Sequence, residues 1–94
     1  VALRGGRMKR GEVLQTAEQL ICGDRQAAYG DATQSHQRIA DLWTAYLDTE
    51  VCALDVAAMM VLLKVSRSKG ADRDDNWIDI CGYAALAGEM QGNG

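Results

Sequence analysis

The sequence predicts an all-α domain of four helices. Proline, the strongest helix breaker, is absent, and the helix-favouring residues Ala, Leu, Met, Gln and Arg are plentiful. β-Branched residues never form the run alternating with polar residues that a half-buried strand requires. Apolar residues recur instead at spacings of three and four in four separate segments. These three observations favour helices throughout the chain.

Length and composition favour one domain that associates with further copies of itself. Of the 94 residues, 48% are hydrophobic and 24% are charged. A chain this short buries only about 60–65% of the surface that its unfolded form exposes. A single copy therefore cannot easily bury this many hydrophobic residues. We therefore expect residues 8–94 to form a single domain that homo-oligomerisation completes, most simply as a dimer. Residues 1–7 are expected to be a cloning remnant or a disordered start, with Met8 as the natural initiator.

Net charge, the length of apolar runs and cysteine spacing indicate which partners and which compartment to expect. The net charge of -3 does not suit a protein that coats a phosphate backbone, so nucleic acid is not an expected partner. No run of about 18 apolar residues exists, so no membrane span is expected. Cys22, Cys52 and Cys81 are too far apart for CxxC pairs, and we expect three small core residues in a reducing cytoplasm.

The first helix is expected over Gly11–Cys22 and the second over Thr33–Leu47, with Thr33 or Asp31 as its cap. His36 lies one turn before Ile39, near the apolar stripe of the second helix. It is either a hydrogen-bonded packing residue or a ligand. The connection of residues 23–32 holds glycines, aspartates and Tyr29, so it is either a plain helix connection or a functional loop.

The third helix is expected over Asp55–Ser68, with Asp55 as its cap. Residues 56–63 are apolar almost all round, which predicts either the central helix of the domain or the seam of an oligomer. Lys64 and Arg67 are three residues apart and share a face. Their heads either reach water at the end of the helix or face an anion, which would be an acidic cluster or a phosphate.

The fourth helix is expected from about Asp74 to Met90. Asp75 and Asp79 are four residues apart, so their carboxylates share one face and repel each other. Either Lys64 and Arg67 neutralise the pair, or the pair holds a hard divalent cation such as Mg²⁺. Gly82 permits the close approach of another helix or of a flat ligand, and Tyr83 could offer its hydroxyl to the same site.

The order of these motifs resembles a family of phage and prophage proteins, from about Ala17 to Glu89. The motifs are Tyr29-Gly30-Asp31, Ile39-Ala40-x-Leu42-Trp43-x-x-Tyr46-Leu47, Asp55-Val56-x-x-Met59-Met60-x-x-Leu63-Lys64-x-x-Arg67 and Asp75-Asn76-x-x-Asp79-x-x-Gly82-Tyr83-Ala84. That family in turn resembles the MazG-like all-α nucleoside triphosphate pyrophosphatases and the phage nucleotide-modification-associated domains.

The resemblance implies a MazG-like four-helix bundle in the cytoplasm of a bacterial host, with a Mg²⁺-dependent nucleotide site. The residues that it implies for this site are Asp75 and Asp79 as metal ligands and catalytic acids, Lys64 and Arg67 at phosphate, and Tyr29, Asp31 and Tyr83 around the nucleotide. The pyrophosphatases carry an ExxE pair where this chain has the apolar residues 56–63, unless Asp24 or Asp31 replaces it.

Two functions therefore remain open. The chain is either a nucleotide-handling phage protein, with or without pyrophosphohydrolase activity, or a non-catalytic accessory protein whose helical oligomer binds a host protein. The first predicts acidic residues that converge on a pocket. The second predicts ion pairs between the acidic and basic residues and an exposed apolar patch.

Overall fold

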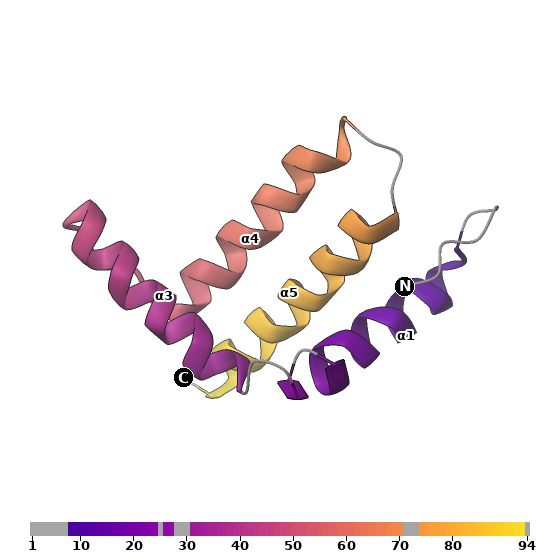
Figure 1. The fold of residues 1–94 in the computed structure, drawn as a ribbon, viewed down its shortest axis with the longest axis horizontal. Coiled ribbons are helices and arrows are strands. Elements are labelled where there is room, and N and C mark those ends of the chain that lie inside the picture. The colour runs from indigo at the N-terminus through magenta and orange to yellow at the C-terminus, as the bar shows by residue number, and fades with distance from the viewer. Residues whose placement is uncertain (1–7, 25, 28–30, 71–73, 94) are drawn as a thin grey trace.

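The computed structural model of the chain describes residues 8–24, 26–27, 31–70 and 74–93. Within these residues the elements, in chain order, are α1 (Arg10–Gln19), the π-helical turn η1 (Leu20–Asp24), α3 (Ala32–Leu47), α4 (Ala53–Ser68) and α5 (Asp74–Asn93) (Figure 1).

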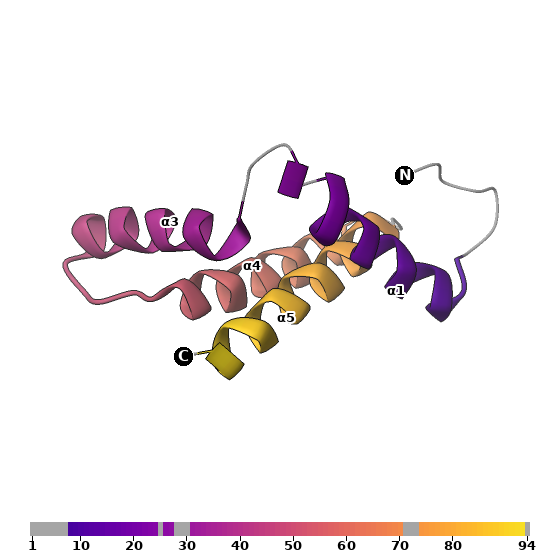
Figure 2. The same cartoon turned by 90° about the horizontal axis from the view of Figure 1, so that it is seen from below.

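Helices α4 and α5 lie side by side along most of their length and form the centre of the structure (Figure 1). Helix α1 packs on α5, and α3 packs mainly on α4. The end of α3 near Leu47 projects beyond the other helices, as two perpendicular views show (Figures 1 and 2). The result is elongated, with extents of 45 × 28 × 23 Å.

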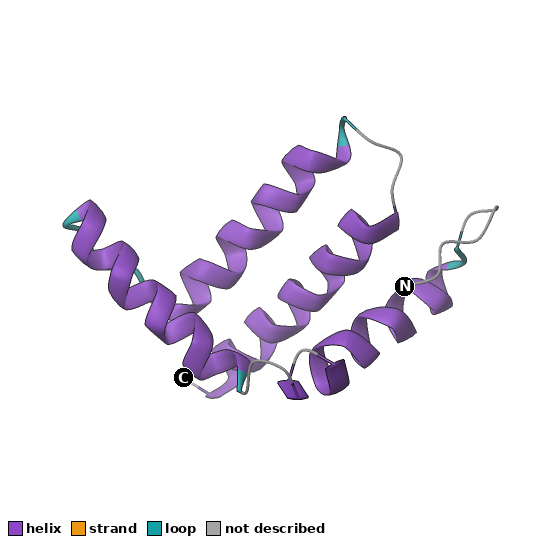
Figure 3. Cartoon of the chain, in the orientation of Figure 1, coloured by secondary structure: helices purple, strands orange, loops and turns teal. Residues whose placement is uncertain are grey.

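The described residues are all helical or in loops, without a strand, which confirms the all-α prediction and its four helices (Figure 3). A MazG-like bundle and its oligomerisation stay predictions. No helix of the described residues is long and apolar enough to cross a membrane.

Two helix starts show how side chains satisfy free backbone N–H groups. Asp31 is the N-cap of α3, and its carboxylate accepts a hydrogen bond from the backbone N–H of Gln34 at 3.1 Å. The prediction that Asp55 caps the third helix is wrong. Helix α4 begins two residues earlier with Cys52 as its N-cap, and the Asp55 carboxylate reaches back to accept from the Cys52 N–H at 3.1 Å.

The other boundaries also differ from expectation. Helix α1 ends at Gln19, and the chain continues as η1 through Cys22 and Gly23. Helix α5 continues past Met90 to Asn93. The expectation that all three cysteines belong to the core is wrong, because Cys22 and Cys52 are exposed and Cys81 is half-buried.

The buried core of one copy is small. Its apolar residues, among those described, are Ala17, Ala40, Ala53, Val56, Ala57 and Ile78. Only Val56 and Ile78 are large side chains that are completely buried. Large apolar side chains stay exposed on every helix: Leu14, Leu42, Tyr46, Leu47, Met59, Leu62, Leu63, Val65 and Trp77. Helix α4 is therefore central, but it is not covered on all sides.

Candidate functional site

A cavity of about 200 Å³ lies where α1, η1, α3, α4 and α5 meet. Most of its lining is apolar, from residues that include Ala17, Ile21, Ile39, Val56, Met60, Ile78 and Leu86. Five polar side chains also line it: Gln26, Ser35, His36, Asp79 and Tyr83. Asp79 and Tyr83, which are two of the predicted site residues, therefore share this cavity.

His36 is almost completely buried on α3, with 7% of its surface exposed. Its Nδ1 lies 2.8 Å from the carbonyl oxygen of Ala32. Since a carbonyl only accepts, Nδ1 carries the proton and donates it, which leaves Nε2 of the neutral ring as an acceptor. Nε2 is buried, and none of the described residues hydrogen-bonds it. The histidine is thus packed in the interior and keeps one polar atom that has no partner among the described residues.

Tyr83 stands beside His36 in the lining of this cavity. The two ring centroids are 6.1 Å apart, and the ring planes meet at 62°, which is an edge-to-face contact. The contact joins α3 to α5, two helices that otherwise touch little. His36 and Tyr83 together give the cavity two aromatic rings, against which a flat ligand could pack.

Asp79 forms an ion pair across the α4–α5 interface. The Nζ of Lys64 lies 2.9 Å from Oδ2 of Asp79, and the two side chains are 16% and 21% exposed. Lys64 lies one turn beyond Met60, which lines the cavity, and its ammonium contacts Asp79, another lining residue. The structure thus pairs Asp79 with Lys64, as one of the two sequence interpretations predicts, and cation binding stays a prediction.

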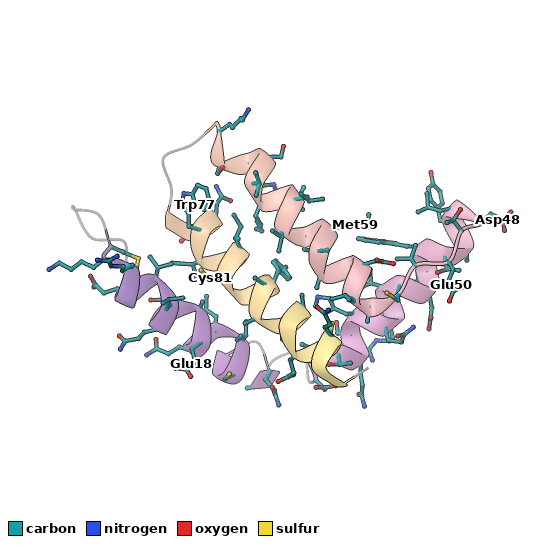
Figure 4. The ribbon with its side chains drawn as sticks, turned by 180° about the vertical axis from the view of Figure 1, so that it is seen from behind. Glu18, Asp48, Glu50, Met59, Trp77 and Cys81 are labelled. Carbon is teal, nitrogen blue, oxygen red and sulfur yellow. The ribbon has the colours of Figure 1, made fainter. Side chains whose placement is uncertain are left out.

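Those of the remaining predicted site residues that the structure describes lie outside the cavity lining. Arg67 is exposed in the last turn of α4, three residues after Lys64. Asp75 is half-buried one turn before Asp79, and it too has an interaction partner. Asp31 serves as the cap of α3. Tyr29 lies outside the described residues, and Trp77 is exposed near the start of α5 (Figure 4).

Gly82 is buried in α5, where another helical segment approaches it closely, while the approach of a flat ligand stays a prediction. A Cβ atom at this position would lie 3.0 Å from Cγ2 of Ile21, so η1 packs closely against the glycine. The same glycine lines the cavity beside Tyr83.

A metal site built by the protein alone does not fit the described side chains. Among them, no group of three or more His, Cys, Asp or Glu residues is arranged to hold an ion. Asp79 is already neutralised by Lys64. Mg²⁺ is, however, commonly held by one or two carboxylates together with the phosphates of a nucleotide. A magnesium ion shared between Asp75, Asp79 and a nucleotide stays a prediction.

Sequence reasoning missed the position of His36 within the cavity. A signal was present, because His36, Ile39, Ala40 and Trp43 have the spacing of one helix face. That spacing places the histidine on the packed side of α3. It does not reveal that Asp79 and Tyr83 of α5 lie at the same cavity.

The model of a family described as a domain of unknown function, DUF6378, matches residues 12–91. The Gene 55 protein of Mycobacterium phage L5 is 46% identical over 81 residues, which cover 84% of this chain and 52% of the relative. The Gene 55 protein of Mycobacterium phage D29 is 38% identical over 73 residues, which cover 77% of this chain and 48% of the relative. The chain thus spans about half the length of these relatives. No solved structure matches it. The predicted resemblance to phage proteins is confirmed, whereas that to MazG-like pyrophosphatases stays a prediction.

Proposed function

This chain belongs to the DUF6378 family, which includes mycobacteriophage proteins, and we propose that it binds a nucleotide. The base would occupy the cavity beside His36 and Tyr83, and the phosphates would lie at Lys64 and Arg67. The observation that carries the proposal is that Asp79 lines the cavity and also holds Lys64 at 2.9 Å. An ion pair is also what the accessory-protein alternative predicts, so the proposal rests on the place of this pair beside the cavity. An apolar cavity therefore has a cation at its edge.

The cavity matches one part of a nucleotide. Ligand pockets usually measure about 300–1,000 Å³, so a cavity of about 200 Å³ suits a base and leaves the sugar and phosphates outside. The rings of His36 and Tyr83 offer flat surfaces. Nε2 of His36 can accept a hydrogen bond, and every common base carries an N–H group that could donate it.

The phosphates have cations within reach of the cavity edge. Arg67 lies about 4.5 Å beyond Lys64 along α4, at 1.5 Å per residue. Ammonium and guanidinium groups both bind phosphate oxygens well. A nucleotide phosphate would compete with Asp79 for Lys64, and the carboxylate that it displaces could meet Mg²⁺ carried by the phosphates.

We propose binding without hydrolysis. The pyrophosphatases that the sequence resembles carry a second pair of acids, and residues 56–63 of this chain contain no carboxylate. Because Asp79 is paired with Lys64, the described part of the chain offers no acid that is placed to replace that pair. The cavity is then a recognition site rather than a reaction centre.

Isothermal titration with nucleoside mono- and triphosphates, with and without Mg²⁺, tests this proposal. Lys64→Ala should weaken binding by about ten- to a hundred-fold, because it removes a charged hydrogen bond to phosphate. Asp79→Ala should abolish the part of the affinity that depends on Mg²⁺. Arg38→Ala is the control, since this exposed cation of α3 lies outside the cavity lining. No heat with any nucleotide, or equal affinities for wild type and Lys64→Ala, would reject the proposal.

A further inference from the structure

One side of α4 is exposed, and its charged and apolar residues follow a regular order along the helix. We define the outer α4 face as Asp55, Ala58, Met59, Leu62, Val65, Ser66 and Lys69, all of which are exposed. On the opposite side of the helix, Val56 and Ala57 are buried, and Lys64 pairs with Asp79 of α5. Met59 lies on the side of α4 that is turned away from α5 (Figure 4).

The outer α4 face is symmetric about Leu62. Asp55 lies seven residues before Leu62, and Lys69 lies seven residues after it. Between these two ends the face is apolar or small. Seven residues are close to two helical turns, so all three residues project in nearly the same direction. The face therefore carries an acid at one end, a base at the other and an apolar centre.

We propose that this face binds the same face of a second copy, with the two α4 helices antiparallel and a two-fold axis at Leu62. In this arrangement Asp55 of each copy meets Lys69 of the other. Met59 faces Val65, and the small residues Ala58 and Ser66 face each other and let the backbones approach. Such an isologous interface needs a surface that is complementary to itself, and opposite charges at equal distances from the centre provide it.

Association with a second copy would also compensate for the small buried core of a single chain. Among the described residues, one chain buries only two large side chains completely, whereas four large apolar side chains on α4 stay exposed: Met59, Leu62, Leu63 and Val65. Contiguous apolar surface of this kind marks an interaction site. A partner with charges of one sign would attract one end of the outer α4 face and repel the other. The interface lies away from the cavity, so this proposal does not rest on nucleotide binding.

The first test measures the mass of the 94-residue chain by analytical ultracentrifugation over a wide range of concentrations. We expect a shift from 10.2 kDa toward twice that mass. Leu62→Glu should remain monomeric at all concentrations, because it places two like charges on the axis. Leu42→Glu is the matched control, since Leu42 of α3 is 69% exposed and Leu62 is 66% exposed. Circular dichroism verifies that both variants are folded.

The second test identifies the register. A carbodiimide joins a carboxylate directly to an amine, and Asp55 and Lys69 of one chain are about 21 Å apart along α4, too far for a link within one copy. A cross-link between these residues in the dimer, found by mass spectrometry, supports the antiparallel register. A dimer without that link, or one that only Leu42→Glu dissociates, overturns the proposal. A monomer at every concentration overturns it too, and would assign the face to another protein.

Discussion

Two glycines inside α5 show that one residue type has opposite consequences at different places. A glycine in a helix interior costs about 1 kcal/mol relative to alanine, mainly through backbone entropy. A Cβ atom at Gly88 would meet nothing within 4 Å. At Gly82 it would lie 3.0 Å from Cγ2 of Ile21. Only Gly82 therefore has a structural reason to be glycine.

Gly88→Ala should raise the free energy of unfolding by about 1 kcal/mol, since nothing offsets the gain in helix propensity. Gly82→Ala should gain less or lose stability, because the Ile21 methyl must move. Urea denaturation of both variants beside the wild type measures the difference. Equal gains for the two variants would mean that η1 does not pack on Gly82 as closely as the structure shows.

The protonation of His36 is a second prediction at the scale of one residue. The Ala32 carbonyl fixes the proton on Nδ1. Long-range ¹⁵N–¹H spectra of the folded chain should therefore show Nδ1 protonated and Nε2 unprotonated in the neutral ring. His36 is the only histidine, so the signal is unambiguous. A spectrum with the proton on Nε2 would contradict the hydrogen bond from Nδ1 to the Ala32 carbonyl. Nε2 could then no longer accept a hydrogen bond from a bound base.

At the scale of one element, the start of α4 depends on the ionisation of Asp55. Hydrogen bonds from the Cys52 backbone N–H and then from its thiol hold the pKa of Asp55 below its usual value of 3.8. Since the pKa is lower in the folded chain, the carboxylate stabilises the fold above pH 3.8, and this contribution is lost as the pH falls through the lowered pKa. Asp55→Ala should therefore be less stable than wild type at neutral pH, and the two should converge in strong acid. Urea denaturation over a pH series measures the free energy of unfolding of both proteins. If the difference between them does not vary with pH, the ionised Asp55 carboxylate is not what stabilises the start of α4.

The contact between α4 and α5 depends on the Lys64–Asp79 pair. Both groups are mostly buried, so removal of one leaves a charge without its partner. Asp79→Asn or Lys64→Met alone should lower the free energy of unfolding by about 1–2 kcal/mol, because the sites keep some solvent. The double variant Lys64→Met/Asp79→Asn should cost less than the sum of these two single variants. Additive losses in this double-mutant cycle would show that the pair contributes no coupling.

The four helices could be predicted from the sequence because the spacing of apolar residues depends only on neighbours along the chain. The start of α4 could not, since the reciprocal cap of Cys52 and Asp55 adds two residues before Asp55. For the site, spacing placed Asp75 and Asp79 on one face of α5, and it offered Lys64 as a partner. The convergence of His36 with Asp79 and Tyr83 depends on how α3 packs against α4 and α5, and no local pattern specifies that.

The whole molecule is more open than a single domain of its length. A compact domain of 94 residues has a radius of gyration of about 12 Å, whereas this chain has 14.2 Å. The projecting end of α3 and the separate packing of α1 on α5 account for the difference (Figure 2). An open arrangement in which few of the described side chains are completely buried gives a single chain little packing to stabilise it.

If association of α4 faces completes the core, thermal stability must depend on protein concentration. Mass action favours the folded dimer as concentration rises, so the midpoint of thermal unfolding should increase by about 3–6 °C for each tenfold increase. Leu62→Glu should have a lower midpoint that does not vary with concentration, whereas Leu42→Glu should follow the wild type. Circular dichroism melts over a hundredfold range measure this. A constant midpoint for the wild type would mean that one copy of these helices folds on its small core alone.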